Sequence, residues 1–122
     1  MANVRVMYWK EIPVQVQAQD EGARPATAPL DERFQQGVDA IAMFDGSMGS
    51  DEYLMAWEWQ EYGDMEGAAQ EVAEKVAARF NERFPLDFVA RIRDLQNSGQ
   101  RDARPGAVDA WLDESPKDEG TR

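Results

Sequence analysis

The chain contains no cysteine and no histidine, so its candidate catalytic groups are carboxylates, hydroxyls, amines and tyrosines. Thiolate chemistry, disulfides, structural zinc and imidazole acid–base catalysis are therefore excluded for this sequence. Carboxylate pairs could act as acid and base, but a chain with 24 acidic residues has such neighbours by chance. We interpret the pairs as solvated helix faces and expect no catalytic residues. The pairs are Asp31/Glu32, Asp51/Glu52 and Glu58/Glu61.

The loop DGSMGSDE, residues 45–52, has the polar composition of a cation-binding or phosphate-binding loop. A calcium loop of the EF-hand type needs a glutamate at its twelfth position, where this chain has Ala56. A phosphate-binding P-loop needs a lysine, which this loop lacks. The pattern is instead typical of a turn followed by a helix with Ser50 as its N-cap. We expect neither a metal nor a cofactor.

A set of aromatic, amide and basic side chains suits binding better than catalysis, because aromatic residues and arginine are enriched at protein interfaces. Four of them would share one exposed, partly aromatic surface if the first two strands pair as expected below. The full candidate binding set is Tyr8, Trp9, Lys10, Gln15, Gln17, Arg33, Tyr53 and Trp57. The alternative is that Trp9 and Trp57 are core residues and that Arg33 pairs with a nearby carboxylate.

Residues 3–19 must position most of these side chains, since they form the only long run with strand character. From Ile12 onward, apolar and polar residues alternate, as in a half-buried strand. A two-residue turn at positions 10 and 11 would pair Trp9 with Ile12. That register buries Trp9, Met7, Ile12, Val14 and Val16 and leaves Val4, Val6 and Tyr8 beside the glutamines. Lys-Glu is poor turn chemistry, so a longer loop or a bulge would invert the two faces.

The rest of the body has helical periodicity, with segments expected at 31–44, 51–62, 66–84 and 87–96. The segment 51–62 carries aromatic residues on nearly all sides. A helix of this kind must be covered by the protein on two sides or must present one side to a partner. Gly37 lies inside the first helix and suggests close packing, against the sheet. Residues 20–29 have the composition of a flexible loop. The expected fold is α+β, an N-terminal β-hairpin packed against three to four α-helices.

The C-terminal part is polar and rich in charge, glycine and proline. We expect a single domain at 1–99 and an acidic, mostly disordered tail at 100–122. Within the tail, AVDAWL at 107–112 has helical spacing, and it would either dock on a partner or cap the core of this domain.

The net charge of −11 bears on the partners of the protein. Nucleic acids and anionic membranes attract basic surfaces, so we expect neither as a partner. The sequence contains no run of apolar residues long enough to cross a membrane and no apolar signal region at its start, and we expect a cytoplasmic protein.

Three segments resemble a small bacterial domain family known as "virulence factor": YWKEIPVQV (8–16), LDERFQQGVDAIAM (30–43) and SDEYLMAW (50–57). The resemblance covers residues 3–60, and the helical remainder to Gly99 is similar in layout. It implies an accessory role, with an enzyme of one-carbon metabolism (folate or corrinoid methyl transfer) as the partner. Relatives tend to have a basic loop after the second strand, whereas this chain has DEGARPATAP, so an anion site of the family is in doubt here.

Three functional hypotheses follow. The favoured one is a non-catalytic accessory or protein-interaction module, which could also form a homodimer through the edge of the hairpin. The second is a small enzyme subunit whose site a partner protein completes, with Tyr8, Lys10 and Arg33 contributing. The third, a nucleic-acid-linked regulator, is disfavoured by the negative charge.

Overall fold

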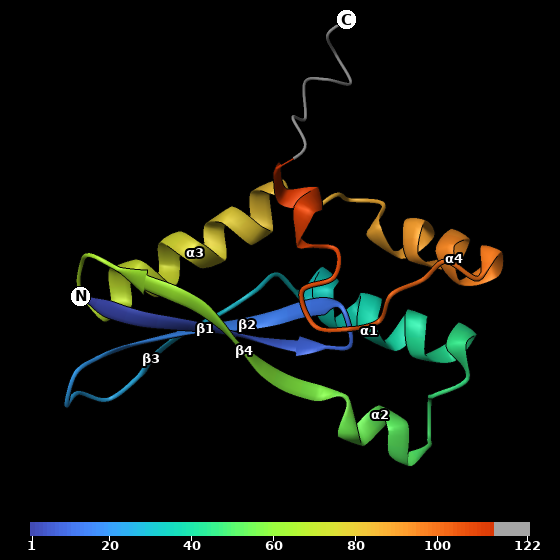
Figure 1. Cartoon of the computed structure of the whole chain (residues 1–122), viewed down its shortest axis with the longest axis horizontal. Helices are drawn as coiled ribbons and strands as arrows, with labels where there is room; N and C mark the ends of the chain where they lie inside the picture. The colour runs from blue at the N-terminus through green and yellow to red at the C-terminus, as the bar shows by residue number, and fades with distance from the viewer. Residues whose placement is uncertain (114–122) are drawn as a thin grey trace, which may run out of the picture.

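A computed structural model describes residues 1–113, which form a four-stranded antiparallel sheet with helices packed against it (Figure 1). The strands are β1 (Ala2–Trp9), β2 (Ile12–Asp20), β3 (Ala26–Pro29) and β4 (Trp57–Met65), in the order β3-β2-β1-β4. The helices are α1 (Glu32–Asp45), α2 (Asp51–Met55), α3 (Ala69–Arg83), α4 (Phe88–Ser98) and the 3-10 helix η1 (Asp109–Asp113). The predicted α+β class is confirmed, with a larger sheet than the predicted hairpin.

A β-bulge in the first hairpin reverses the faces that the sequence predicted. Trp9 pairs with Ile12 as expected, but the register then shifts and Met7 lies opposite Gln15. The extra residue on β2 moves the alternation by one position, so each later side chain changes face. The predicted burial of Met7 and exposure of Val4, Val6 and Tyr8 are therefore wrong. Val4, Val6 and Tyr8 are buried, as are Val16 and Ala18 of β2.

Strand β4 replaces most of the helix predicted for 51–62. Helix α2 ends at Met55, and from Trp57 the chain pairs with β1, with Trp57 opposite Trp9. The prediction of a helix fails because a short aromatic run is compatible with both the helical and the strand period. In addition, the outer edge of β1 offers hydrogen-bonding partners to the backbone, and a sequence pattern does not reveal them. In the same way, β3 occupies part of the predicted flexible loop 20–29, where it pairs with β2.

Helix α3 packs across β1, β2 and β3 (Figure 1). It contributes six buried side chains to the core. Helices α1 and α4 lie side by side (Figure 1), and Gly37 of α1 lies directly against Phe88 and Val89 of α4. A Cβ atom at position 37 would lie 2.3 Å from Cζ of Phe88. The close packing that Gly37 predicts is therefore present, but its partner is α4 rather than the sheet.

Residues 99–113, here called the strap, fold back over the domain. Leu112 is buried, the Trp111 ring lies 5.9 Å from that of Phe84, and Arg83 Nε donates to the Leu112 carbonyl at 2.6 Å. Of the two roles expected for 107–112, this geometry corresponds to the cap. The expected tail at 100–122 was mostly disordered with a possible short helix at 107–112. Residues 100–113 fold onto the domain and include η1 near the expected helix, whereas 114–122 lie outside the described residues. The division at residue 99 stays a prediction.

In the described part of the chain, β4 pairs with β1 and β3 pairs with residues 15–18 of β2, so β3 and β4 are the edge strands. Whether the protein forms a homodimer stays a prediction. Within residues 1–113, no helix has both the length and the apolar character needed to cross a membrane.

Candidate functional site

The sheet has a second face, opposite α3, on which Asn3 and Arg5 of β1 are exposed and Met7 is only partly buried. The register places Pro29, Gln15, Met7 and Trp59 in one row across this face, and Thr27, Gln17, Arg5 and Glu61 in the next. We call these residues, together with Asn3, Asp64 and Trp57, the open face. A shallow hollow of about 370 Å³ lies in it, lined by Met7, Val14, Gln15, Pro29 and Trp57.

The open face is organised around Arg5 and Trp59, two residues that the candidate set omitted. The Arg5 guanidinium lies over the Trp59 ring, 4.2 Å from its centroid, and Arg5 Nε donates to Gln17 at 2.7 Å. Cation–π contact and hydrogen bond together fix three side chains from three different strands. Their arrangement depends on β4, so the alternation of Trp57, Trp59 and Glu61 was the signal that could have identified them.

An aromatic cluster closes one end of the sheet. Trp9 is fully buried, its Nε1 donates to the Tyr53 carbonyl at 2.9 Å, and the two ring centroids are 5.7 Å apart. The Tyr53 ring meets Trp57 edge-on at 6.3 Å, and its hydroxyl donates to Asp39 at 3.0 Å. Burial, followed by the contact with Asp39, raises the pKa of Tyr53. These three predicted residues lie together, but only Trp57 also lines the hollow.

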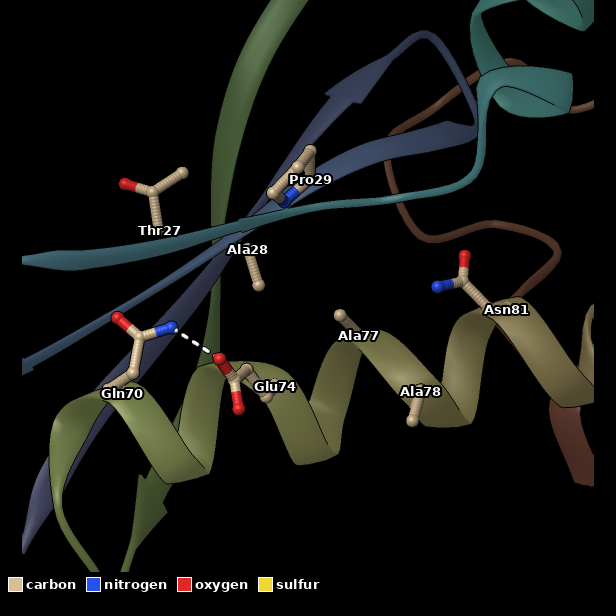
Figure 2. Close-up of a pocket in the computed structure, with 8 residues that line it drawn as sticks. All are labelled: Thr27, Ala28, Pro29, Gln70, Glu74, Ala77, Ala78 and Asn81. Atoms are coloured by element: carbon tan, nitrogen blue, oxygen red, sulfur yellow. Dashed lines mark hydrogen bonds between the residues drawn. The ribbon is translucent and has the colours of Figure 1, made fainter.

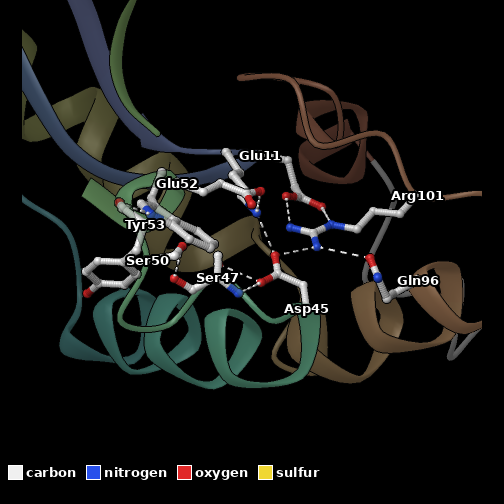
Figure 3. Close-up of polar contacts among 10 residues, drawn as sticks. Glu11, Asp45, Ser47, Ser50, Glu52, Tyr53, Gln96 and Arg101 are labelled. Carbon is white, nitrogen blue, oxygen red and sulfur yellow. Dashed lines mark hydrogen bonds and ion pairs between the residues drawn. The ribbon is translucent and has the colours of Figure 1, made fainter. Parts of the chain in front are cut away.

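A buried ionic network lies beside this cluster and joins three distant parts of the chain (Figure 3). Glu11 is fully buried and accepts two hydrogen bonds from Arg101 of the strap, each 2.7 Å long. Arg101 also donates to Asp45 at 2.9 Å, and Asp45 accepts from Lys10 Nζ at 2.7 Å. Lys10 makes a second ion pair with Glu52 at 2.6 Å. Each charge is thus paired, as buried charges must be.

The pKa of Asp45 shows how strongly this network holds its carboxylates. Burial alone would raise that pKa, but hydrogen bonds from Lys10, Ser47 and Arg101 outweigh it and hold the pKa at about 2. A hollow of about 210 Å³ adjoins Lys10 and Arg101, yet both cations are engaged by carboxylates. The network therefore acts as a clamp between the β1–β2 turn, α1 and the strap.

Tyr8 and Arg33, two further predicted residues, serve the fold at separate places. The Tyr8 hydroxyl donates to Asp109 of the strap, and burial raises the pKa of both groups. Among the described residues, Asp109 Oδ1 is buried without a hydrogen-bond partner. Arg33 donates to the carbonyls of Asn81, Phe84 and Pro85, at 3.0, 3.0 and 3.2 Å, where α3 ends. Burial lowers the pKa of Arg33.

A further hollow, of about 360 Å³, lies between β3 and α3 (Figure 2). Small side chains such as Ala77 and Ala78 form its floor, and Gln70 donates to Glu74 across its helical side at 2.7 Å. Glu74 is its only titratable residue, so it contains no acid–base pair.

The eight predicted binding residues therefore separate into three groups. Gln15, Gln17 and Trp57 lie on the open face, Trp9, Lys10 and Tyr53 lie at the end of the sheet, and Tyr8 and Arg33 lie elsewhere. Whether they bind a partner stays a prediction. Among residues 1–113, no cluster of three acidic side chains has a geometry that could hold a metal ion.

Comparison with known protein families gives one match: the family model described as "Virulence factor" aligns with residues 7–92, which is more than half of the chain. The matched range includes all four strands except the first residues of β1, as well as α1 to α3 and the start of α4. No curated protein and no solved structure matches the chain.

Proposed function

The chain belongs to the virulence factor family, and from this premise we propose that it is a non-catalytic protein-interaction module that binds its partner through the open face. The observation that carries the proposal is the composition of that face. An antiparallel sheet commonly has one solvated face, but such a face is normally polar. Here it carries Met7, Trp57, Trp59 and Pro29 around a hollow.

Binding a partner would remove this apolar surface from water. Aromatic rings held in place by neighbours contribute to binding at a small cost in conformational entropy. Arg5 and Gln17 already hold Trp59 in one orientation, so the ring is pre-organised. The amide of Gln15 adds a hydrogen-bonding group to the lining of the hollow.

The family resemblance suggests which partners to try first, namely one-carbon enzymes of the folate or corrinoid methyl-transfer type. The alternative function, a small enzyme subunit completed by a partner, would require Tyr8, Lys10 and Arg33 to converge. Each of them is engaged within this domain at a different place, which favours the interaction module.

The test is quantitative affinity capture in the native host, followed by titration of each captured protein and of the two one-carbon candidates. A Met7→Thr/Gln15→Lys double variant changes the hollow without touching the core, and Gln70→Lys on α3 is the matched control. We expect the double variant to lose the partner and the control to retain it, with unfolding curves showing that both are folded. Equal recovery of partners by the two variants would remove the open face from the proposal.

A further inference from the structure

Strand β4 leaves one backbone edge free in the part of the chain that the structure describes. The sheet order makes β3 and β4 the two edge strands. β3 has four residues and ends in Pro29, which has no N–H group to donate, so it is a poor template for another strand. β4 has nine residues and pairs with β1 on one side. A long unpaired edge of this kind can accept a strand from another chain.

The side chains of β4 determine which kind of strand would fit. Glu58, Glu61 and Asp64 are exposed, and none of them forms a salt bridge with a lysine or arginine among the described residues. Their hydrogen bonds come from neutral amides: Asn3 donates to Glu61 and Asp64, and Gln60 donates to Glu58. Asn3 lies across from Asp64 in the register, whereas Gln60 is on β4 itself.

Two observations show that residues 1–113 do not neutralise this edge. Arg5 stands opposite Glu61 in the register, but its guanidinium lies over the Trp59 ring and donates to Gln17. The sequence also has no lysine or arginine from residue 34 to residue 74. The edge therefore keeps a negative charge that an incoming cation can pair with.

A second copy of the chain is a poor occupant for the same edge. If two β4 strands paired antiparallel about Glu61, Glu61 would face its own copy and Glu58 would face Asp64. Like charges directly opposite one another destabilise a strand pair.

We propose that the free edge of β4 binds an extended, basic segment of a partner protein, which adds to the sheet as a fifth strand. This inference rests on the proposed interaction function and specifies the chemistry of the partner. The register shifts between Val4 and Arg5, so Trp57 to Glu61 form the regular part of the edge. A strand beside them would place cations near Glu58 on one face and near Glu61 and Trp59 on the other, since side chains alternate.

The experiment measures binding of a fluorescent ten-residue peptide of repeating Arg-Arg-Val-Val, which places arginines on both faces of a strand, to the full-length chain by anisotropy. We expect binding that weakens as salt is added, and no binding of the peptide with glutamate in place of arginine. A peptide N-methylated at each residue keeps the charges but loses the N–H donors, so we expect its affinity to fall by at least about tenfold. An N-methylated peptide that binds as tightly as its parent would overturn strand addition.

Two variants locate the site. Glu58→Gln/Glu61→Gln should weaken binding about tenfold, because it removes both carboxylates beside the added strand. Glu74→Gln/Glu82→Gln on α3 changes the net charge equally and should leave affinity unchanged. Equal losses in the two double variants would mean attraction by net charge alone, and failure of the basic peptide to bind would mean that the acidic residues only protect the edge from self-pairing.

This outcome is separate from that of the proposed function. If the basic peptide fails to bind while Met7→Thr/Gln15→Lys still loses the captured partner, the open face stands and the β4 inference falls. If the peptide binds while that variant keeps all its partners, the binding surface is the edge rather than the open face.

Discussion

Arg101 and Arg104 lie three positions apart, and each makes a salt bridge through two nitrogens to one carboxylate. The Arg101 side chain is 6% exposed and its partner Glu11 0%, whereas Arg104 is 83% exposed and Asp102 44%. An exposed ion pair contributes little, because water solvates both partners well. Removing either partner of a buried ion pair is strongly destabilising, because it leaves an uncompensated charge in the interior.

We therefore expect Arg101→Ala to lower the free energy of unfolding by about 3 to 5 kcal/mol, because Glu11 would be left buried without its partner. Arg104→Ala should cause no measurable change. Urea unfolding at neutral pH compares the two variants with the parent chain. Equal stabilities for the two variants would show that the network does not act as a clamp.

The same network predicts an acid-sensitive part of the stability. The pKa of Asp45 is held at about 2, against an ordinary value of 3.8, so its contribution is complete above the ordinary value and is lost as the pH falls toward 2. Asp45→Asn should be less stable than the parent at pH 7, and the difference should shrink between pH 4 and pH 2. Urea unfolding over this range measures it, and a constant difference would contradict the assignment.

Among the helices and strands, close backbone approach determines how α1 packs against α4, and backbone pairing determines the conformation of β4. Gly37 lets α1 approach α4 so closely that the Phe88 ring occupies the space of a side chain. Glycine normally lowers helix stability relative to alanine, so Gly37 favours the contact between the helices rather than the stability of α1 itself. β4 similarly takes its conformation from β1 and not from its own composition.

Gly37→Ala tests the helix contact, because propensity and packing predict opposite signs. Alanine favours the helix by about 1 kcal/mol, but overpacking against Phe88 costs about 1 to 3 kcal/mol. We expect a net loss of stability on urea unfolding, whereas Gln36→Ala on the exposed side should have little effect. The loss should be smaller in a Phe88→Leu background, where the ring is absent. A stabilised Gly37→Ala chain would show that α1 and α4 are not in contact there.

For the whole molecule, the strap completes the core that the sheet and helices begin. It brings Arg101 to Glu11, Asp109 to Tyr8 and Leu112 to the neighbourhood of α3. The first of these contacts joins residues 90 positions apart in sequence, so it closes a long loop and orders the β1–β2 turn.

Two leucine truncations measure how much of the stability the strap supplies. Leu112 is 1% exposed and Leu86 is 87% exposed. Leu112→Ala should lower the free energy of unfolding by about 2 to 5 kcal/mol through lost apolar contact and cavity formation. Leu86→Ala should change it by less than about 0.5 kcal/mol. If the two substitutions have the same effect on urea unfolding, the strap does not contribute to the core.

The sequence by itself determined the features that depend on local spacing and on residue type. The apolar stripe of α3, from Val72 to Phe80, follows the helical period regardless of its surroundings, and the absence of histidine and cysteine excludes whole classes of chemistry. The family strings at 8–16, 30–43 and 50–57 are also local, and they fall within the matched range.

Only the tertiary structure decided which face of the sheet is open and which edge is free. The bulge on β2 changes which residues of β2 share a face with Val4, Val6 and Tyr8 of β1, and no residue pattern shows where a strand gains one residue. β4 is a strand because it pairs with the outer edge of β1. This pairing with a segment distant in sequence overrides a local pattern that is compatible with either a helix or a strand. Pairing between distant segments is a property of the folded chain, and the candidate surface is made from such pairings.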